Sequence, residues 1–442
     1  MRDYLTILGA GLAGSEAAWQ AAERGVSVVL YEMRPVKPTP AHKTDHCAEL
    51  VCSNSLGNNQ SPSAPYLLKE ELRKFNSLVI DAGDTHAVPA GAALAVDREL
   101  FSKKITEQLL KHPNITLIRE EVTEIPSEGP VIVATGPLTS PRLSESISRL
   151  IGQEYLYFYD AISPIVDANT INYDKTFFAS RYDKGTDDYL NCPLNEGQYY
   201  SLVNELKNGE KVPFKSFEKP IYFEGCMPVE ELAMRGDKTL AFGPLKPVGL
   251  LHPETKEQFY AVVQLRHENK EGTAFNLVGF QTKLTYPEQK RVIRLIPGLE
   301  NAEFFRFGAI HRNTYINAPD VLSCELDLKK NSGIYFAGQI IGVEGYVESV
   351  SMGLLAALSA VKRIKGEVYS TPPVETALGS LLKYVTETRR QSFQPMNINY
   401  GLFQVHEMKI RNKRERNKKI ELKALDSLSQ WMETINGELV KE

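Results

Sequence analysis

Residues 4–32 decide the fold, and they read YLTILGAGLAGSEAAWQAAERGVSVVLYE. A short apolar run of strand type at residues 4–8 leads directly into GAGLAG at residues 9–14. An alanine-rich segment of helical type follows as far as Gly25, and a second apolar run ends at Glu32. A strand, the G-x-G-x-x-G pattern, a helix, a second strand and an acid, in this order, are typical of a dinucleotide-binding βαβ unit.

Each glycine of the pattern has its own physical role. Gly9 permits the tight turn after the strand, Gly11 lets a pyrophosphate approach the backbone, and Gly14 lets the helix pack closely. The start of the helix offers free N–H groups and a partial positive charge to that pyrophosphate. Glu32 is placed to accept hydrogen bonds from a ribose diol, which favours FAD or NAD, although Arg34 leaves a 2′-phosphate open. The structural alternative is a βαβ unit whose glycines serve only the turn.

Composition and charge indicate an ordinary globular chain. The sequence has 442 residues, of which 42% are hydrophobic and 24% are charged, and this length suits two or three domains. The net charge of −4 gives no sign of nucleic-acid binding by the whole chain, so such a site would be a local patch. We expect no signal peptide, no membrane span and, with five cysteines, no disulfide scaffold; the simplest expectation is a reduced, cytoplasmic protein.

Two later stretches match a flavoprotein pattern. Residues 131–136 read VIVATG, which resembles the step at which flavoproteins of the two-dinucleotide-fold type leave their FAD domain. Residues 333–342 read GIYFAGQIIG, and a long helix is expected over about 346–364. In such proteins this second unit lies along the ribityl chain, but Gln339 stands where many carry Asp, which puts the usual carboxylate contact in question. The residues expected to bind FAD are Gly9, Ala10, Gly11, Leu12, Ala13, Gly14, Glu32, Arg34, Ala134, Thr135, Gly136, Gly338 and Gln339.

The composition changes between these motifs. Residues 166–299 are rich in Tyr, Phe, Lys and short strand patterns, and we interpret them as an inserted α+β domain without a second G-x-G-x-x-G. Residues 1–165 and 300–442 would then form a discontinuous, Rossmann-like FAD-binding domain of the two-dinucleotide-fold type, with basic helices from about residue 372. The predicted fold class is therefore α/β.

Two local predictions concern the surroundings of these motifs. Residues 122–125 and 130–134 have the pattern of a β-hairpin. The polar cluster at residues 53–57 is expected to start a short helix directly after Cys52. A thiol at a helix N-terminus is favoured as a nucleophile or proton carrier.

Cys47 and Cys52 follow the first βαβ unit, a placement similar to the redox C-x4-C of flavin disulfide reductases. Those enzymes need a second dinucleotide fold and a C-terminal His–Glu base. The sequence lacks the second fingerprint, and cysteine spacing transfers poorly between families. A zinc site of His42, His46 and these two cysteines matches no usual ligand spacing beyond H-x3-H, so we expect no metal.

Cys226 lies between an aromatic strand pattern and Pro228, which opens an acidic helical turn. A thiol at a strand end beside a helix start suits a nucleophile, whereas a small core residue is the commoner fate of a single cysteine. The local sequence leaves both interpretations open. Cys192 and Cys324 have no comparable context, and we expect them to be structural.

The C-terminal segment carries the clearest local charge. Residues 406–419 contain seven basic residues against two acids. Such a patch suits contacts to nucleic-acid phosphates, although most charge runs are solvated helix faces. The candidate contacts are Arg389, Arg390, Lys409, Arg411, Lys413, Arg414, Arg416, Lys418 and Lys419.

Taken together, the motifs resemble those of the TrmFO family, the folate- and FAD-dependent tRNA uracil-5-methyltransferases. The resemblance covers nearly the whole chain and adds five stretches to residues 9–14. They are YEMRP (31–35), CSNSL (52–56), EGCMPVEEL (224–232), HRNTYI (311–316) and FAGQIIGVEGY (336–346). The MnmG (GidA) flavoproteins, which modify tRNA wobble uridine, share the two FAD motifs but are substantially longer. An MnmG-like protein, a flavin disulfide oxidoreductase using Cys47 and Cys52, and a non-catalytic FAD-bearing RNA-binding protein are the alternatives.

The resemblance implies methylation of uridine 54 at C5 in the T-loop of tRNA. The carbon would come from 5,10-methylenetetrahydrofolate, and NAD(P)H would supply electrons through FAD. Uracil C5 is a poor nucleophile, so a thiolate must add to C6 to activate it. The resemblance marks Cys226 and Cys52 as the two functional thiols; we favour Cys226 as nucleophile and Cys52 as base, with the reverse assignment open. It implies tRNA as the partner. The basic tail and the inserted domain are our candidates for holding the tRNA, and we expect no obligate protein partner.

Overall fold

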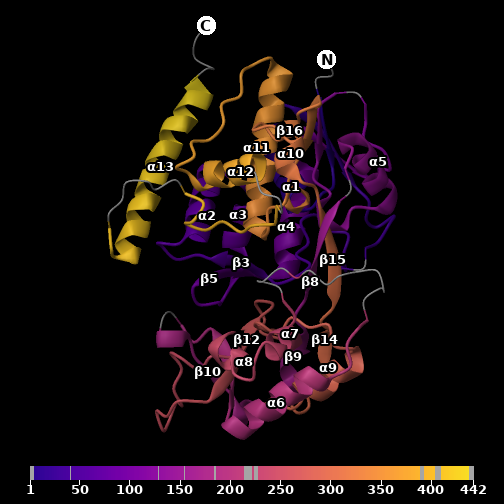
Figure 1. Ribbon diagram of the computed structural model, residues 1–442. Coiled ribbons are helices and arrows are strands. Elements are labelled where there is room, and N and C mark those ends of the chain that lie inside the picture. The colour runs from indigo at the N-terminus through magenta and orange to yellow at the C-terminus, as the bar shows by residue number, and fades with distance from the viewer. Residues whose placement is uncertain are drawn as a thin grey trace.

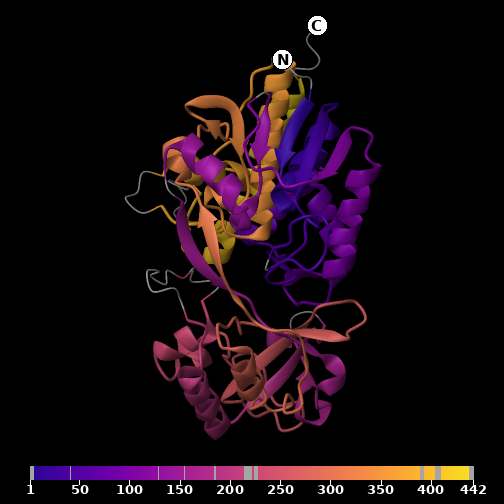
Figure 2. The ribbon, with the colours of Figure 1, turned by 90° about the vertical axis from the view of Figure 1, so that its right-hand side faces the viewer.

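The computed structural model describes residues 4–39, 41–127, 129–153, 155–183, 186–213, 222, 227–388, 393–403 and 410–437. Figure 1 shows two bodies, one above the other. Both ends of the chain build the upper body, and the middle of the chain builds the lower one. Figure 2, turned by a quarter, shows a pair of strands running between them.

The upper body is organised around a six-stranded sheet with the order β16-β17-β7-β1-β2-β6. β1 pairs in parallel with β2 and β7, β17 pairs in parallel with β7, and only β16 runs antiparallel. The central strands are continuous buried apolar runs because helices cover both faces of a parallel sheet. The bounds are β1 (Tyr4–Leu8), β2 (Ser27–Glu32), β6 (Ile115–Arg119), β7 (Val131–Val133), β16 (Asp327–Leu328) and β17 (Asn331–Phe336). The predicted α/β, Rossmann-like fold is confirmed.

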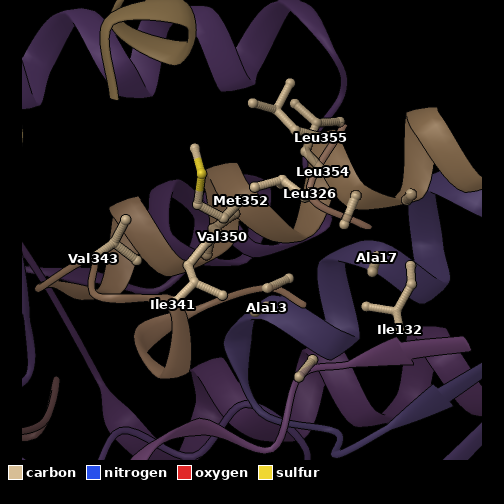
Figure 3. Close-up of a cluster of buried hydrophobic side chains, with 14 of the residues drawn as sticks. Ala13, Ala17, Ile132, Leu326, Ile341, Val343, Val350, Met352, Leu354 and Leu355 are labelled. Carbon is tan, nitrogen blue, oxygen red and sulfur yellow. The ribbon is translucent and has the colours of Figure 1, made fainter. Parts of the chain in front are cut away.

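Helices α1 (Leu12–Ala22) and α11 (Tyr346–Lys365) pack closely against each other. A Cβ added to Gly353 would lie 2.2 Å from the carbonyl oxygen of Ala13, so only glycine allows this approach. Figure 3 shows small and branched side chains filling this layer. The other helices of the upper body are α2 (Ala64–Lys74), α3 (Leu78–Thr85), α4 (Arg98–Lys111), α5 (Pro141–Ile151), α10 (Ala318–Val321), α12 (Ala377–Glu387) and α13 (Lys413–Gly437).

The lower body has its own sheet, with the order β10-β11-β12-β13-β9-β14, and its own hydrophobic core. Every pairing in this sheet is antiparallel. Its strands are β9 (Ile165–Asp167), β10 (Phe177–Phe178), β11 (Tyr189–Leu194), β12 (Ala261–His267), β13 (Ala274–Leu277) and β14 (Phe304–Arg306), and its helices are α6 (Glu196–Asn208), α7 (Val229–Met234), α8 (Thr239–Phe242) and α9 (Tyr286–Ile293). The domain limits at 165/166 and 299/300 stay a prediction.

Two strands join the bodies, and a small sheet lies beside them. β8 (Leu156–Ala161) carries the chain down and β15 (Ile310–Tyr315) carries it back, paired antiparallel throughout. β3 (Ser55–Asn58), β5 (Ala93–Val96) and β4 (Ala87–Val88) form a three-stranded sheet. No helix in the part of the chain that the structure describes is long and apolar enough to cross a membrane.

Two local predictions are wrong. Residues 122–125 form no strand, because the following segment, β7, takes a central place in the sheet and pairs with β1 and β17 instead. Residues 55–58 form strand β3 rather than a helix. Pairing with β5 holds this stretch extended, and the carbonyl of Asn54 accepts a backbone hydrogen bond from Val96. Tertiary pairing therefore outweighs the local helix signal.

Candidate active site

A cleft of about 1070 Å³ opens at the carboxyl ends of the central parallel strands, where open α/β sheets bind ligands. β1 contributes Gly9 and the turn that follows, β2 contributes Glu32, and the segments after β7 and β17 contribute the remaining wall. The predicted FAD-binding residues that line the cleft are Gly9, Gly11, Leu12, Ala13, Glu32, Arg34, Ala134, Thr135, Gly136, Gly338 and Gln339. Ala10 and Gly14, the other two predicted FAD-binding residues of the glycine turn, do not line the cleft.

The glycine turn has the shape that a pyrophosphate requires. Gly9 has a φ of +95°, a left-handed conformation that favours glycine. A Cβ on Gly14 would lie 1.8 Å from the carbonyl oxygen of Gly9, so helix and strand leave room for nothing larger. A Cβ on Gly11 would meet no protein atom within 4 Å. Gly11 therefore faces space that a ligand can fill, and the turn fits the diphosphate of a dinucleotide at the start of α1.

Glu32 is fixed by its neighbours. Its Oε2 accepts a hydrogen bond of 3.2 Å from the backbone N–H of Ala10, and its Oε1 accepts bonds of 3.0 Å and 2.9 Å from Arg34 N and Nε. Burial raises the pKa of Glu32, but the hydrogen bonds and charge of Arg34 outweigh it, so the pKa is lowered. Arg34 also contacts Glu49 Oε2 at 3.0 Å. Since two carboxylates hold Arg34, the site suits an unphosphorylated ribose.

A second cavity of about 1330 Å³, here called the chamber, adjoins the FAD cleft. The cleft and the chamber share Val51, Pro137, Leu138, Gln339 and Tyr346 as lining residues. The chamber wall combines the loop before β3, the two joining strands and the start of α11. Its titratable lining residues are Cys52, Asp160, His311, Glu344, Tyr346 and Glu348. A group bound in the cleft therefore has direct access to a thiol and several acids.

Cys52 is half-buried in the chamber wall, and its backbone is held on both sides. Its N–H donates to the hydroxyl of Tyr346 at 2.8 Å, and its carbonyl accepts from Arg98 Nη2 at 2.7 Å. Arg98 also pairs with Glu268 of the lower body, with Nε and Oε2 2.6 Å apart. Two residues of the upper body therefore fix the backbone of Cys52, and one of them, Arg98, is itself held by the lower body.

Cys47 differs from Cys52 in its burial and in its distance from the cavities. It is fully buried, lines neither the cleft nor the chamber, and its N–H donates to Thr106 Oγ1 at 2.8 Å. Burial raises the pKa of the Cys47 thiol to about 11. Both thiols are free. Within the described ranges, no group of three or more His, Cys, Asp and Glu side chains is arranged to hold a metal ion.

Cys226 lies outside the described residues, but both of its flanks are held beside the chamber. Tyr222 forms a parallel bridge with Tyr159 of β8, and its hydroxyl accepts from Lys283 Nζ at 2.9 Å. On the other side, Val229 N–H donates to the carbonyl of Gln281 at 2.7 Å, and Gln281 lines the chamber.

Gln339, the residue that departs from the usual flavoprotein pattern, joins the cleft to the acids of the chamber. Its Nε2 donates to Glu344 Oε2 at 2.8 Å. Burial raises the pKa of Glu344 well above its ordinary value, and the charge of Asp160 raises it further. Burial also raises the pKa of Glu348 to about 6. Glu344 thus favours its protonated form.

Several chamber residues were not predicted as site residues. His311, Glu344 and Tyr346 lie within the family stretches HRNTYI and FAGQIIGVEGY, which gave a signal that these stretches matter but no role for individual residues. Asp160 of the chamber wall and Arg98, which contacts the backbone of Cys52, gave no signal, because a strand residue and a helix residue reach the site only through the tertiary fold.

The basic tail lies on and before α13. Arg411, Lys413, Arg414, Lys418 and Lys419 are exposed, and Arg416 is half-buried. Lys418 Nζ is 2.6 Å from Glu421 Oε1 and donates to Ser61 Oγ at 3.0 Å. Arg389, Arg390 and Lys409 lie outside the described residues.

Comparison with known proteins identifies the family. The family model described as GIDA, Glucose inhibited division protein A, matches residues 4–368. A protein of Natranaerobius thermophilus named methylenetetrahydrofolate--tRNA-(uracil-5-)-methyltransferase TrmFO is 58% identical over 97% of this chain and 99% of its own length. A Bacillus subtilis protein of the same name is 53% identical over 98% of this chain and 99% of its own. The chain belongs to the TrmFO family.

The TrmFO assignment agrees with the fold of the more distant GidA proteins. GidA of Aquifex aeolicus in its form I crystal has a TM-score of 0.71 and 18% identity, covering 98% of this chain and 76% of that chain. The form II crystal gives a TM-score of 0.70 and 17% identity, covering 98% and 73%. At this identity the likeness shows the fold alone.

Proposed function

We propose that the chain transfers the one-carbon unit of 5,10-methylenetetrahydrofolate to C5 of uridine 54 in the T-loop of tRNA, with NAD(P)H as reductant. The observation that carries this proposal is the Cys52 thiol in a chamber that opens from the FAD cleft. The names of relatives at 53–58% identity over nearly the full chain support it. A tRNA substrate and the free state of Cys47, Cys52, Cys192 and Cys324 support a cytoplasmic location.

The residues of the cleft fit FAD. The turn at Gly9 and Gly11 would hold the pyrophosphate, Glu32 the adenosine ribose, and the segments at Thr135 and Gly338 the remainder of the cofactor. When bound, FAD supplies the two electrons that bring a methylene carbon to the methyl level. The mouth of the chamber lies beside Gln339 and Tyr346, where the cofactor and the substrate base would meet.

The chain supplies the thiols that activate uracil. A thiolate adds to C6, and C5 of the resulting enolate bonds to the one-carbon unit as the bond between that carbon and the folate nitrogen breaks. A base then removes the C5 proton, and the thiolate leaves to restore the ring. We assign the addition to Cys226 and the proton transfer to Cys52, whose backbone is fixed by Tyr346 and Arg98. The reverse assignment exchanges these two roles and leaves the rest unchanged.

The target base must leave its stack to enter the chamber. We propose that the lower body and the basic tail hold the tRNA during this step. The proposed tail contacts are Arg411, Lys413, Arg414, Arg416, Lys418 and Lys419, together with Arg389, Arg390 and Lys409 outside the described residues.

The decisive experiment follows labelled carbon from methylenetetrahydrofolate into tRNA with the purified flavoprotein and NAD(P)H. We expect labelled methyl at T-loop uridine with this donor; transfer from S-adenosylmethionine instead would overturn the proposal. Cys226→Ala should keep its flavin and lose methylation by at least about 10³-fold, since it removes the covalent activation of uracil. The matched control Cys324→Ala changes an exposed cysteine outside both cavities and should retain full activity. Equal activity of the two variants would exclude Cys226 as the nucleophile.

A further inference from the structure

A polar hollow of about 790 Å³ lies between the loop after β3 and the first turns of α13. It lies outside the FAD cleft and the chamber, and its lining is polar except for one proline. The loop side provides Asn58, Gln60, Ser61, Pro62 and Ser63, and the helix side provides Lys413, Arg414 and Asn417. The hollow therefore combines two cations with several hydrogen-bonding groups.

The two walls of the hollow are fastened together. Ser61 Oγ donates to the buried carboxylate of Glu421 at 3.0 Å, and Lys418 Nζ contacts the same carboxylate at 2.6 Å. Lys418 is the cation that pairs with this acid. Lys413 and Arg414 are exposed, and in the described part of the chain neither has a carboxylate within salt-bridge distance. Their charges are available to an anion.

Asn417 gives an independent sign of a ligand. The residue is only 8% exposed, it lines the hollow, and its Oδ1 has no hydrogen-bond partner among the described residues. A buried amide oxygen without a partner is unfavourable. Oδ1 is shielded from solvent, so a ligand hydroxyl can donate to it only after a half-turn of the amide exchanges the positions of Oδ1 and Nδ2. The residues of the hollow therefore suit a ligand that has both an anionic group and a hydroxyl group.

The position of the hollow connects it to the chamber. Gly57 lines the chamber and Asn58, the next residue of β3, lines the hollow. Consecutive Cα atoms are about 3.8 Å apart, so the two cavities meet at one strand. At the other end of the loop Pro65 again lines the chamber. The hollow and the chamber therefore border the same segment, residues 57–65.

We propose that this hollow is a ribose–phosphate subsite for RNA. Lys413 and Arg414 bind a backbone phosphate, and the amide of Asn417 binds the 2′-hydroxyl of the adjacent ribose, which distinguishes RNA from DNA. The inference rests on the proposed tRNA substrate and assigns a specific nucleotide contact to part of the basic tail. This subsite also explains why Ser61 of the loop is hydrogen-bonded to Glu421 and Lys418 of α13.

The charge test uses the full-length flavoprotein and an unmodified tRNA transcript. Lys413→Glu should raise the Kd for tRNA about tenfold and lower the salt dependence of binding by about one counterion. The matched control Lys423→Glu reverses another exposed lysine on α13, one that does not line the hollow, and should change the Kd less than twofold. Equal effects of the two variants, at unchanged flavin content, would overturn the subsite.

The hydroxyl test removes single 2′-hydroxyl groups from the T-loop nucleotides next to the target uridine. One such deoxy substitution should weaken binding to the wild-type protein about fivefold, the effect of one hydrogen bond. Asn417→Ala should bind the deoxy and the ribo transcript equally. If the wild type methylates tRNA but shows no such difference at any position, the subsite is wrong and the proposed function stands. If the wild type neither binds nor methylates tRNA, both are wrong.

Discussion

The FAD cleft and the chamber lie side by side, but backbone atoms shape the first and side chains shape the second. The cleft is shaped by backbone, at Gly9, Gly11 and Gly14, and has one buried acid held by Arg34. The chamber is shaped by reactive side chains that distant segments bring together. Binding a cofactor that many enzymes share requires a backbone cradle, whereas the reaction of one family requires particular side chains. Substitutions in the cleft should therefore affect stability and FAD binding, whereas substitutions in the chamber should affect methyl transfer.

The largest effect is expected at the backbone of the cleft. Gly14→Val places atoms on the carbonyl of Gly9, which a Cβ already approaches to 1.8 Å, and should destabilise the protein by more than about 3 kcal/mol. Gly11→Ala is the matched control, because its Cβ meets no protein atom within 4 Å. It should leave apoprotein stability within about 1 kcal/mol and still lose FAD. Denaturant unfolding and flavin absorbance measure both; an FAD-replete Gly11→Ala protein would contradict the cradle.

The chamber should respond to the loss of one thiol without any loss of cofactor. Cys52→Ala should lower methyl transfer by at least about 10²-fold, the usual contribution of a general base, with normal flavin content. Cys47→Ala should keep its activity and lose about 1 kcal/mol of stability, because it shortens a buried core residue. Iodoacetamide should label Cys52 before Cys47, whose pKa is about 11. Faster labelling of Cys47, read by peptide mapping, would reverse the contrast.

The smallest effect is expected from the acids of the chamber. The folded state raises the pKa of Glu344 above its ordinary value of 4.5. Its contribution to stability is complete below that value and is lost as the pH rises through the folded-state pKa. The free energy of unfolding should therefore fall more steeply between pH 5 and 9 in the wild type than in Glu344→Gln.

Glu415→Gln, which changes an exposed acid on α13, should follow the wild-type pH profile of stability. Parallel profiles for the wild type and Glu344→Gln would show that Glu344 is ionised in the folded protein throughout this range. Unfolding in urea at a series of pH values makes the comparison.

The same contrast explains how far the sequence alone reaches. The cleft was predictable because Gly9, Gly11 and Gly14 lie close together in the sequence, and their spacing follows from the local turn that they form. The Ser53–Gly57 cluster was misjudged because pairing with Ala93–Val96 decides its conformation. Asp160 and His311 are far apart in the chain and become neighbours only because β8 and β15 pair. A local sequence pattern cannot predict a site that depends on the pairing of distant strands.

The pair of strands β8 and β15 has a mechanical consequence. The chain enters and leaves the lower body through two hydrogen-bonded neighbours, and hydrogen bonds such as those from Arg266 to Asn54 and from Tyr189 to Ala90 join the two bodies as well. The strand pair is also a wall of the chamber, through Asp160, His311 and Asn313. Any bending that swings the lower body must therefore change the shape of the reaction space. Arg98 also joins the bodies through its ion pair with Glu268, so the hydrogen bond that it donates to the carbonyl of Cys52 depends on the position of the lower body.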